Sequence, residues 1–202
     1  MNRNSQRNNA AAPGQVRIIG GALRGSKLPV LVRDGLRPSS DRVRETLFNW
    51  LQPVVPGARC LDLFAGSGAL GFEAASRGAR EVVMIERDRG LARSLVSTAG
   101  RLKTDSVRVV EADALRWLQS PPADPAQRFD LAFLDPPFAA DLWNAVVERL
   151  DGWLVDEAWL YLESARDGGA QPGAGWRLHR SGQTRDVEYS LWQRLSGSDA
   201  SG

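Results

Sequence analysis

The sequence has little of the residues on which redox and metal chemistry depend. Among 202 residues there is one cysteine, Cys60, and one histidine, His179. A single cysteine excludes an intrachain disulfide, and neither residue belongs to a pattern with the spacing of metal ligands. Cys60 lies in an apolar run, which indicates a buried structural thiol rather than a nucleophile. We therefore expect no bound metal and a reducing, cytoplasmic location.

Long hydrophobic runs are also missing. No stretch reaches the roughly 18 apolar residues of a membrane-spanning helix, and the first 15 residues lack the apolar segment of a secretory signal. Hydrophobic residues still make up 43% of the chain, which is enough for a packed core. The length fits one domain with a small extension. Because no heptad repeat is evident, we expect a monomer.

The net charge is small but unevenly spread. Residues 1–50 hold nine Lys or Arg and three Asp or Glu, a net charge of +6. The whole chain carries +2, so the remainder carries −4. A basic N-terminal quarter on a mildly acidic body indicates an edge that binds a polyanion. A merely solvated basic face would explain the same charges.

From residue 59 onwards, strand-like and helix-like patterns alternate. We predict strands over 59–65, 81–86, 107–110, 129–134 and 158–163, and helices over 68–77, 89–100, 113–119 and 141–150. This alternation indicates an α/β fold with a parallel sheet and helices on both faces. Two last strands, over 176–179 and 187–194, are predicted to form an antiparallel hairpin that closes the sheet.

The N-terminal part is predicted to be an extension of this domain. Short strands over 16–19 and 27–31 would form a hairpin with a basic, glycine-rich tip. A helix capped by Ser40 or Asp41 would follow, with Val43, Leu47 and Trp50 or Leu51 as its core-facing stripe. We expect the extension over 15–56, the main domain over 57–195, and disordered tails over 1–14 and 196–202.

Three glycines follow the first strand of the main domain. The run R-C-L-D-L-F-A-G-S-G-A-L-G, residues 59–71, predicts a strand that turns sharply into a helix at Gly66, Gly68 and Gly71. Glycines there admit φ > 0 and let a ligand approach the backbone and the free N–H groups of the helix. NAD enzymes, flavoproteins and S-adenosylmethionine (SAM) methyltransferases share this pattern, and a turn without a ligand also fits it.

Acidic side chains stand at or near the ends of the other strands. Ligands of open α/β sheets lie across the carboxyl ends of the strands. Glu86 ends the second strand, about 20 residues beyond the glycines, where a carboxylate can accept both hydroxyls of an adenosine ribose. Asp113 follows the third strand and can accept from an adenine amine. Asp62 precedes the glycines and can orient their loop or reach the amino group of a cofactor.

The fourth strand runs into Asp135-Pro136-Pro137-Phe138, the most specific feature of the chain. The proline pair stiffens the backbone and presents the Asp135 carboxylate and the Pro136 carbonyl as two acceptors. Such a pair suits an exocyclic NH₂ group on a planar ring that stacks on Phe138. The acceptors direct the nitrogen lone pair toward an electrophile and stabilise the developing positive charge. A Pro-Pro turn with a capping Asp is the structural alternative.

These segments resemble a known family. D-P-P-F is typical of class I SAM-dependent methyltransferases that act on exocyclic amines of adenine, cytosine or guanine. V-R-I-I-G-G-A-L-R-G-S-K-L-P-V, R-P-S-S-D-R-V-R-E-T-L-F-N-W-L, D-L-F-A-G-S-G-A-L-G-F-E-A-A-S-R-G-A and F-L-D-P-P-F together closely resemble the RsmD family of bacterial 16S ribosomal RNA guanine-N2 methyltransferases. The resemblance runs from about Val16 to Arg194.

The resemblance implies a seven-stranded, mostly parallel Rossmann-like sheet with an antiparallel last strand. It also implies SAM as methyl donor and guanine N2 of 16S RNA, in the small subunit or a late assembly intermediate, as acceptor. The catalytic set would be Asp135, Pro136 and Phe138. The cofactor set would be Asp62, Phe64, Gly66, Gly68, Glu86, Arg87, Asp113, Ala114 and Arg42. The RNA set would be Arg24, Lys27, Arg37 and Arg44.

One departure and three alternatives accompany this interpretation, and one alternative, a non-catalytic RNA-binding protein on this fold, is opposed by the intact set of acids. The family has a lysine and a glycine shortly before the last strand, whereas this chain has S-G-Q-T-R-D with only Arg185 as a base. A DNA adenine-N6 methyltransferase shares D-P-P-F, but no residues are left for a target-recognition domain. A nicotinamide-dependent oxidoreductase would use the glycines and Glu86, but it has no use for D-P-P-F.

Overall fold

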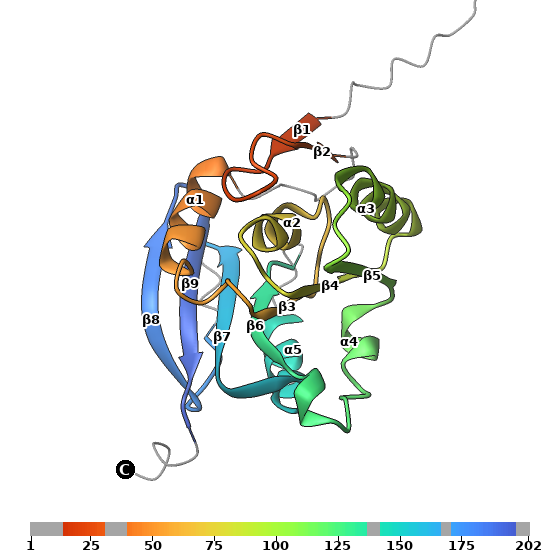
Figure 1. The fold of residues 1–202 in the computed structure, drawn as a ribbon. Helices are drawn as coiled ribbons and strands as arrows, with labels where there is room; N and C mark the ends of the chain where they lie inside the picture. Colours follow the sequence, from red (N-terminus) through yellow and green to blue (C-terminus); the bar gives the residue numbers. More distant parts are fainter. Residues whose placement is uncertain (1–13, 31–39, 137–141, 167–170, 197–202) are drawn as a thin grey trace, which may run out of the picture.

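The computed structural model describes residues 14–30, 40–136, 142–166 and 171–196, and they form three layers. Figure 1 shows a central sheet with α1, α2 and α3 on one side and α4 and α5 on the other. The α/β architecture with a mostly parallel sheet, predicted from the alternating pattern, is confirmed.

Seven strands make the central sheet. They are β3 (Arg59–Asp62), β4 (Glu81–Glu86), β5 (Val107–Glu111), β6 (Phe129–Leu134), β7 (Leu154–Ala165), β8 (Trp176–Gln183) and β9 (Val187–Arg194). Their order is β5-β4-β3-β6-β7-β9-β8. The first five are parallel, and β9 inserts antiparallel between β7 and β8. The antiparallel last strand that the family resemblance implies is therefore present.

The helices cover two separate cores. They are α1 (Asp41–Trp50), α2 (Ala69–Ser76), α3 (Arg89–Leu102), α4 (Ala114–Trp117) and α5 (Leu142–Leu150), with short 3₁₀ turns at Pro125–Gln127 and Asp151–Trp153. One core gathers α1, α2 and α3 side chains against one sheet face. The other gathers α4 and α5 side chains against the opposite face. The sheet is thus apolar on both faces, as a parallel sheet requires.

The N-terminal hairpin forms a sheet of its own and shares the first core. β1 (Gly14–Arg17) pairs antiparallel with β2 (Lys27–Val30), and Gly14 lies opposite Val30. The prediction that residue 14 belongs to a disordered tail is therefore wrong at that residue. Val16, Ile18 and Leu28 are buried in the same core as α1 and the central sheet. The extension is held to the main body by this burial.

Several predicted boundaries shift because tertiary contacts decide them. β3 ends at Asp62 rather than at residue 65, although Leu63 N still donates to Phe133 O. The predicted helix over 113–119 is α4, which spans four residues. β7 begins at Leu154, earlier than expected, because it pairs with β6 across a register shift. Sequence periodicity carries no information on such pairing.

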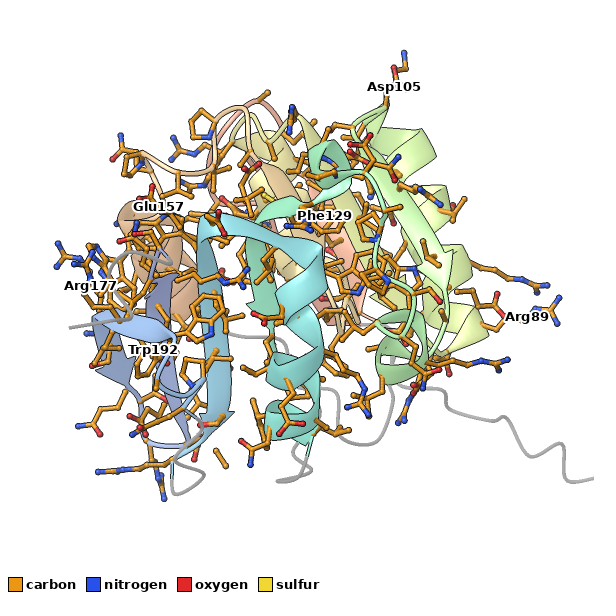
Figure 2. All side chains as sticks on the ribbon, turned by 90° about the horizontal axis from the view of Figure 1, so that it is seen from below. Arg89, Asp105, Phe129, Glu157, Arg177 and Trp192 are labelled. Atoms are coloured by element: carbon orange, nitrogen blue, oxygen red, sulfur yellow. The ribbon has the colours of Figure 1, made fainter. Side chains whose placement is uncertain are left out.

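All five parallel strands point the same way, so their carboxyl ends share one edge. Figure 2 shows Asp105 and Glu157, at the amino ends of β5 and β7, toward the top, and Arg89, which follows β4, at the lower right. In the register, Asp62 of β3 lies beside Met84 of β4 and Phe133 of β6. Residues that follow these strand ends are therefore brought together.

Candidate functional site

A carboxylate from β4 binds the backbone of the glycine loop after β3. Gly66 N donates to Glu86 Oε2 at 2.9 Å, and Asp88 N donates to Glu86 Oε1 at 2.7 Å. Gly66 and Gly68 both have positive φ, of 52° and 77°. A Cβ at Gly68 would lie 2.6 Å from the Phe72 ring and 2.7 Å from Leu95. Both the backbone conformation and the packing therefore require glycine.

Asp62 lies under the start of the next helix. Its Oδ2 accepts a hydrogen bond from Gly71 N at 3.1 Å, as the loop-orienting role predicted. The residue is 2% exposed, and burial raises the pKa of its carboxyl to about 7, with the nearby Glu86 charge adding to the rise. A buried acid with this pKa ionises readily when a cation binds beside it.

Asp113 caps the next strand-to-helix turn. Its Oδ1 accepts from Arg116 N at 3.0 Å, and the side chain is exposed at the end of β5. Ala114 is buried behind it in the α4 core, and Phe64 packs partly buried against that core. Asp113, Glu86 and the glycine loop thus line one stretch of the sheet edge, the place where an adenosine would lie by the strand-end rule.

The D-P-P-F motif follows β6 on the same edge. Asp135 is half-buried and Pro136 is buried. The strand before them is fixed because Leu63 N, at the entry to the glycine loop, donates to Phe133 O at 3.2 Å. The predicted catalytic acid therefore stands next to the predicted cofactor loop. Phe138, also predicted to be catalytic, lies outside the described residues.

The basic residues predicted to bind RNA or cofactor differ in their exposure to solvent. Arg24 and Lys27 are exposed on the hairpin side, and Arg42 and Arg87 are exposed at helix starts. Arg44 is 0% exposed, so its assignment to RNA is wrong. It faces inward because α1 packs that side against α2. Arg37 lies outside the described residues, and its role stays a sequence-based prediction.

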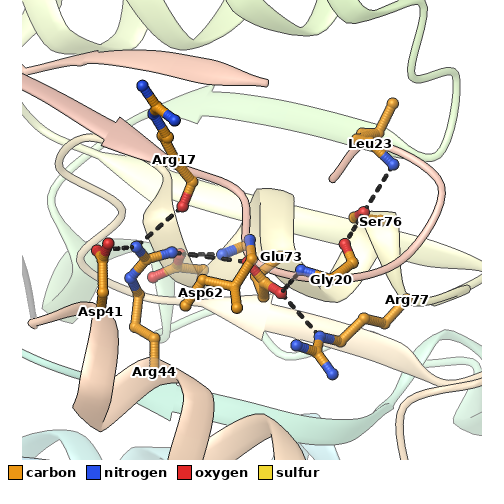
Figure 3. Close-up of polar contacts among 11 residues, drawn as sticks. Arg17, Gly20, Leu23, Asp41, Arg44, Asp62, Glu73, Ser76 and Arg77 are labelled. Atoms are coloured by element: carbon orange, nitrogen blue, oxygen red, sulfur yellow. Dashed lines mark hydrogen bonds and ion pairs between the residues drawn. The ribbon is translucent and has the colours of Figure 1, made fainter. Parts of the chain in front are cut away.

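Sequence reasoning missed the partner that buries Arg44. Glu73 of α2 is 0% exposed, and its Oε2 lies 3.6 Å from Arg44 Nη1 (Figure 3). The same carboxylate accepts from Ile19 N at 2.7 Å, from Gly20 N at 2.8 Å and from Arg77 Nε at 2.8 Å. One charged residue in an otherwise apolar helix, A-L-G-F-E-A-A-S, was the available signal.

A second missed pair lies beside Asp135. On β7, Tyr161 Oη donates to Glu163 Oε2 at 2.7 Å, and both residues are buried. Glu163 stands near the carboxyl end of an apolar strand, W-L-Y-L-E-S, which is the signal that singled out Glu86 and Asp135.

Three other expectations from the sequence concern the thiol of Cys60, a bound metal ion and a membrane-spanning helix. Cys60 is buried, and burial raises the pKa of its thiol, as expected for a structural thiol. Within the described ranges, no group of three or more His, Cys, Asp or Glu side chains is arranged to hold a metal ion. In the same residues, no helix is long and apolar enough to span a membrane.

Comparisons with known proteins find relatives over most of the chain. A family described as Conserved hypothetical protein 95 matches residues 16–193. Ribosomal RNA small subunit methyltransferase D of Escherichia coli K12 is 47% identical over 189 residues, which is 92% of this chain and 93% of the relative.

Solved structures share the fold. The Escherichia coli protein yhhF superposes with a TM-score of 0.80 at 45% identity, covering 90% of this chain and 99% of that one. The protein SMU.776, solved in complex with S-adenosylhomocysteine (SAH), has a TM-score of 0.61 at 16% identity. It covers 84% of this chain and 54% of that one. This last likeness is one of fold alone.

Proposed function

The chain belongs to the family described as Conserved hypothetical protein 95, and on that premise we propose that it transfers a methyl group from SAM to guanine N2 in small-subunit ribosomal RNA. The observation that carries the proposal is the sheet edge itself. There the glycine loop, Glu86 and Asp62 adjoin Asp135 and Pro136. The name of the Escherichia coli relative supports ribosomal RNA as the acceptor.

The residues of the edge fit SAM. SAM carries a positively charged sulfonium attached to an adenosine. Its site therefore needs acidic partners and a protein backbone that the cofactor can approach closely. The pKa of Asp62, raised to about 7 by burial, marks an acid that gains from a neighbouring positive charge. The glycine loop has positive φ at Gly66 and Gly68, so side chains are disfavoured there and a ligand could approach the backbone closely. Glu86 and Asp113 offer acceptors for a ribose and an adenine amine.

The acceptor residues would hold and activate the amine. SAM supplies an electrophilic methyl group on a sulfonium. The Asp135 carboxylate and the Pro136 carbonyl would accept hydrogen bonds from the two hydrogens of N2, which turns its lone pair toward the methyl group. As nitrogen becomes positive, the Asp135 carboxylate stabilises that charge and accepts the proton that the methylated amine releases. The base must leave its stack to reach these groups.

The remaining expectations follow from this activity. The small subunit, or a late assembly intermediate of it, is proposed as the form of RNA on which the enzyme acts. We propose a monomer that acts in the cytoplasm, where ribosomal RNA is assembled.

Transfer of a labelled methyl group tests the proposal. Unmethylated small subunits, naked 16S RNA and duplex DNA are each incubated with labelled SAM and then digested to nucleosides. We expect label in N2-methylguanosine, mainly from the subunits. Label in N6-methyladenine from DNA would overturn the substrate, and SAM binding without transfer to any of the three would overturn the activity.

A further inference from the structure

The buried pair Tyr161–Glu163 lies next to Asp135, and the reaction proposed above uses neither residue. In the parallel pairing of β6 with β7, Phe133 lies opposite Tyr161 and Leu134 opposite Leu162. Continued by one residue, this register would bring Asp135 beside Glu163, and the charges of both acids act on Tyr161. Side chains of paired residues share a sheet face, so both acids point to the side of Phe133 and Tyr161, whose rings meet edge to face at 6.4 Å.

Glu163 is held at both its side chain and its backbone. Tyr161 Oη donates to its Oε2 at 2.7 Å, and Trp143 Nε1 of α5 donates to its carbonyl oxygen at 3.2 Å. Burial and the charges of Glu163 and Asp135 hold the pKa of Tyr161 well above its usual value. Tyr161 therefore stays protonated and remains a donor, which keeps Glu163 fixed as an acceptor.

The donor and acceptor groups next to the exocyclic amine of each base determine which base a second acceptor at this site would recognise. In adenine and cytosine, the ring nitrogen next to the exocyclic amine carries a lone pair. In guanine, the carbon that bears N2 lies between two ring nitrogens: N1 carries a hydrogen and N3 carries a lone pair. A carboxylate accepts only, so it attracts N1–H of guanine and repels the ring lone pair of the other two bases. Flipped bases are read on this edge.

We propose that Glu163 accepts the N1–H of guanine while Asp135 and Pro136 hold its N2 amine, so that Glu163 selects guanine over other bases. Tyr161 is the positioning residue, since it acts only by fixing Glu163. The inference rests on the proposed function and deepens it, because D-P-P-F alone does not distinguish the three amines. Glu163 is 5% exposed, so the contact lies in a desolvated site, where an unmatched hydrogen bond is costly.

The test compares two target bases that share the 2-amine and differ at N1 and in the O6 carbonyl, which 2-aminopurine lacks. Small subunits are reconstituted with RNA that carries either guanosine or 2-aminopurine at the mapped target; the latter keeps the 2-amine but has a lone pair at N1. For the wild type we expect kcat/KM to be about 10- to 100-fold higher on guanosine, the range expected when a charge-assisted hydrogen bond cannot form. In Glu163→Gln the amide can donate to N1, so we expect the ratio to fall toward one.

Two further variants separate recognition from folding. Tyr161→Phe keeps the ring and removes the donor, so the ratio should fall partway. Glu188→Gln makes the same chemical change at an exposed site on β9 and should leave the ratio at the wild-type value. SAM affinity and thermal melting of each variant establish that it is folded.

The outcomes are distinct. An unchanged ratio in both Glu163→Gln and Tyr161→Phe would overturn the inference and leave guanine methylation standing. If the wild type instead methylated adenine, the failure would appear before any variant is compared, and both the proposed function and the role of Glu163 would fall.

Discussion

Acidic residues at the same sheet edge differ in what surrounds them. Asp62 is buried under α2, and burial raises the pKa of its carboxyl to about 7. Glu86 binds two backbone N–H groups of neighbouring loops. Asp135 is half-buried at the end of β6. These surroundings support the different roles proposed for Asp62, at the cofactor, and for Asp135, at the amine, while Glu86 anchors the glycine loop.

Loss of Asp135 should remove the reaction and spare the cofactor. We expect Asp135→Ala to lower kcat by about 10²-fold or more, because one preorganised polar group at the reacting nitrogen is removed. SAM affinity, measured by calorimetry, should change little. Asp156→Ala, at an exposed site on the same sheet, is the matched control. Wild-type turnover by Asp135→Ala would remove this residue from the assigned role.

Asp62 should make SAM affinity depend on pH. Below about pH 7 its carboxyl is protonated in the free protein, so binding of a cation must release that proton. We expect the Kd for SAM to rise as the pH falls from 8 to 6, by up to about tenfold per unit below the pKa. Asp62→Asn should lose this dependence. The variant also corrects for titration of the amino group of SAM, and identical curves would contradict the prediction.

The same pKa predicts how stability varies with pH. The folded-state pKa of Asp62, about 7, lies above the ordinary value of 3.8, so between these values the folded protein holds a proton that the unfolded chain has released. This group therefore lowers the free energy of unfolding as the pH rises from about 4 to 7. Asp62→Asn should be more stable than the wild type at pH 8 in urea, and the difference should shrink toward pH 5.

At the scale of elements, one buried carboxylate joins three segments. Glu73 of α2 binds the loop after β1 through Ile19 N and Gly20 N, and it lies beside Arg44 of α1. Arg44 Nη2 in turn donates to Arg17 O at 3.0 Å and to Asp41 Oδ1 at 2.6 Å. Ser76 of α2 adds a bond from Leu23 N at 2.9 Å (Figure 3). The hairpin and α1 are therefore fastened to α2 by polar contacts as well as by the core.

Removal of Glu73 should destabilise the fold and loosen the hairpin first. Glu73→Ala removes the buried carboxylate beside Arg44 and leaves its ion pair with the exposed Asp41, and loss of one partner of a buried pair costs about 3–5 kcal/mol. Glu73→Gln should also destabilise, because its NH₂ would face a backbone N–H at Ile19 or Gly20. Urea unfolding measures the loss, and hydrogen exchange at these two amides locates it.

The control for this prediction is Glu45→Ala, at an exposed site on α1, which should change the free energy of unfolding by less than about 0.5 kcal/mol. If Glu73→Ala were as stable as Glu45→Ala, the contacts seen at Glu73 would not hold the hairpin to the body.

At the scale of the whole molecule, basic residues from distant segments meet. Arg24 and Lys27 are exposed on the hairpin side, and Arg101, at the end of α3, donates through Nη2 to Lys27 O at 2.7 Å. The basic surface that the charge distribution predicted for residues 1–50 is therefore extended by α3. Substitution of these exposed residues by Ala removes a positive charge without creating a cavity in the core.

Substitutions on this surface should change the salt dependence of RNA binding. We expect Arg24→Ala and Arg101→Ala each to weaken binding and to reduce the slope of log K against log salt concentration. The reduction should be about 0.7 for each phosphate of single-stranded RNA that the variant no longer neutralises. Arg149→Ala on α5, which covers the other sheet face, should leave the slope unchanged. Equal slopes for all three variants would place the RNA elsewhere.

Local patterns predicted much of the fold and of the candidate site. The bounds of β4, β6 and β9 agree with the prediction, Glu86 ends β4 and Asp135 follows β6 as predicted, and Asp62, expected inside its strand, ends β3. This works because alternation of strands with helices specifies a parallel sheet, and a parallel sheet brings all carboxyl ends to one edge. The residue types at those ends could therefore be read before any contact was known.

Only the tertiary structure decided which charged residues are buried and with whom. Arg44 looked like a surface arginine on an amphipathic helix, and Glu73, 29 positions later in the chain, makes it a core residue. Glu163 became a neighbour of Asp135 only because β7 pairs with β6. Periodicity reports which side of an element is apolar, but the partner of a charge depends on packing between segments distant in sequence. The sequence by itself determined the architecture and the residue types at the edge of the sheet, and packing determined which buried residues support that edge.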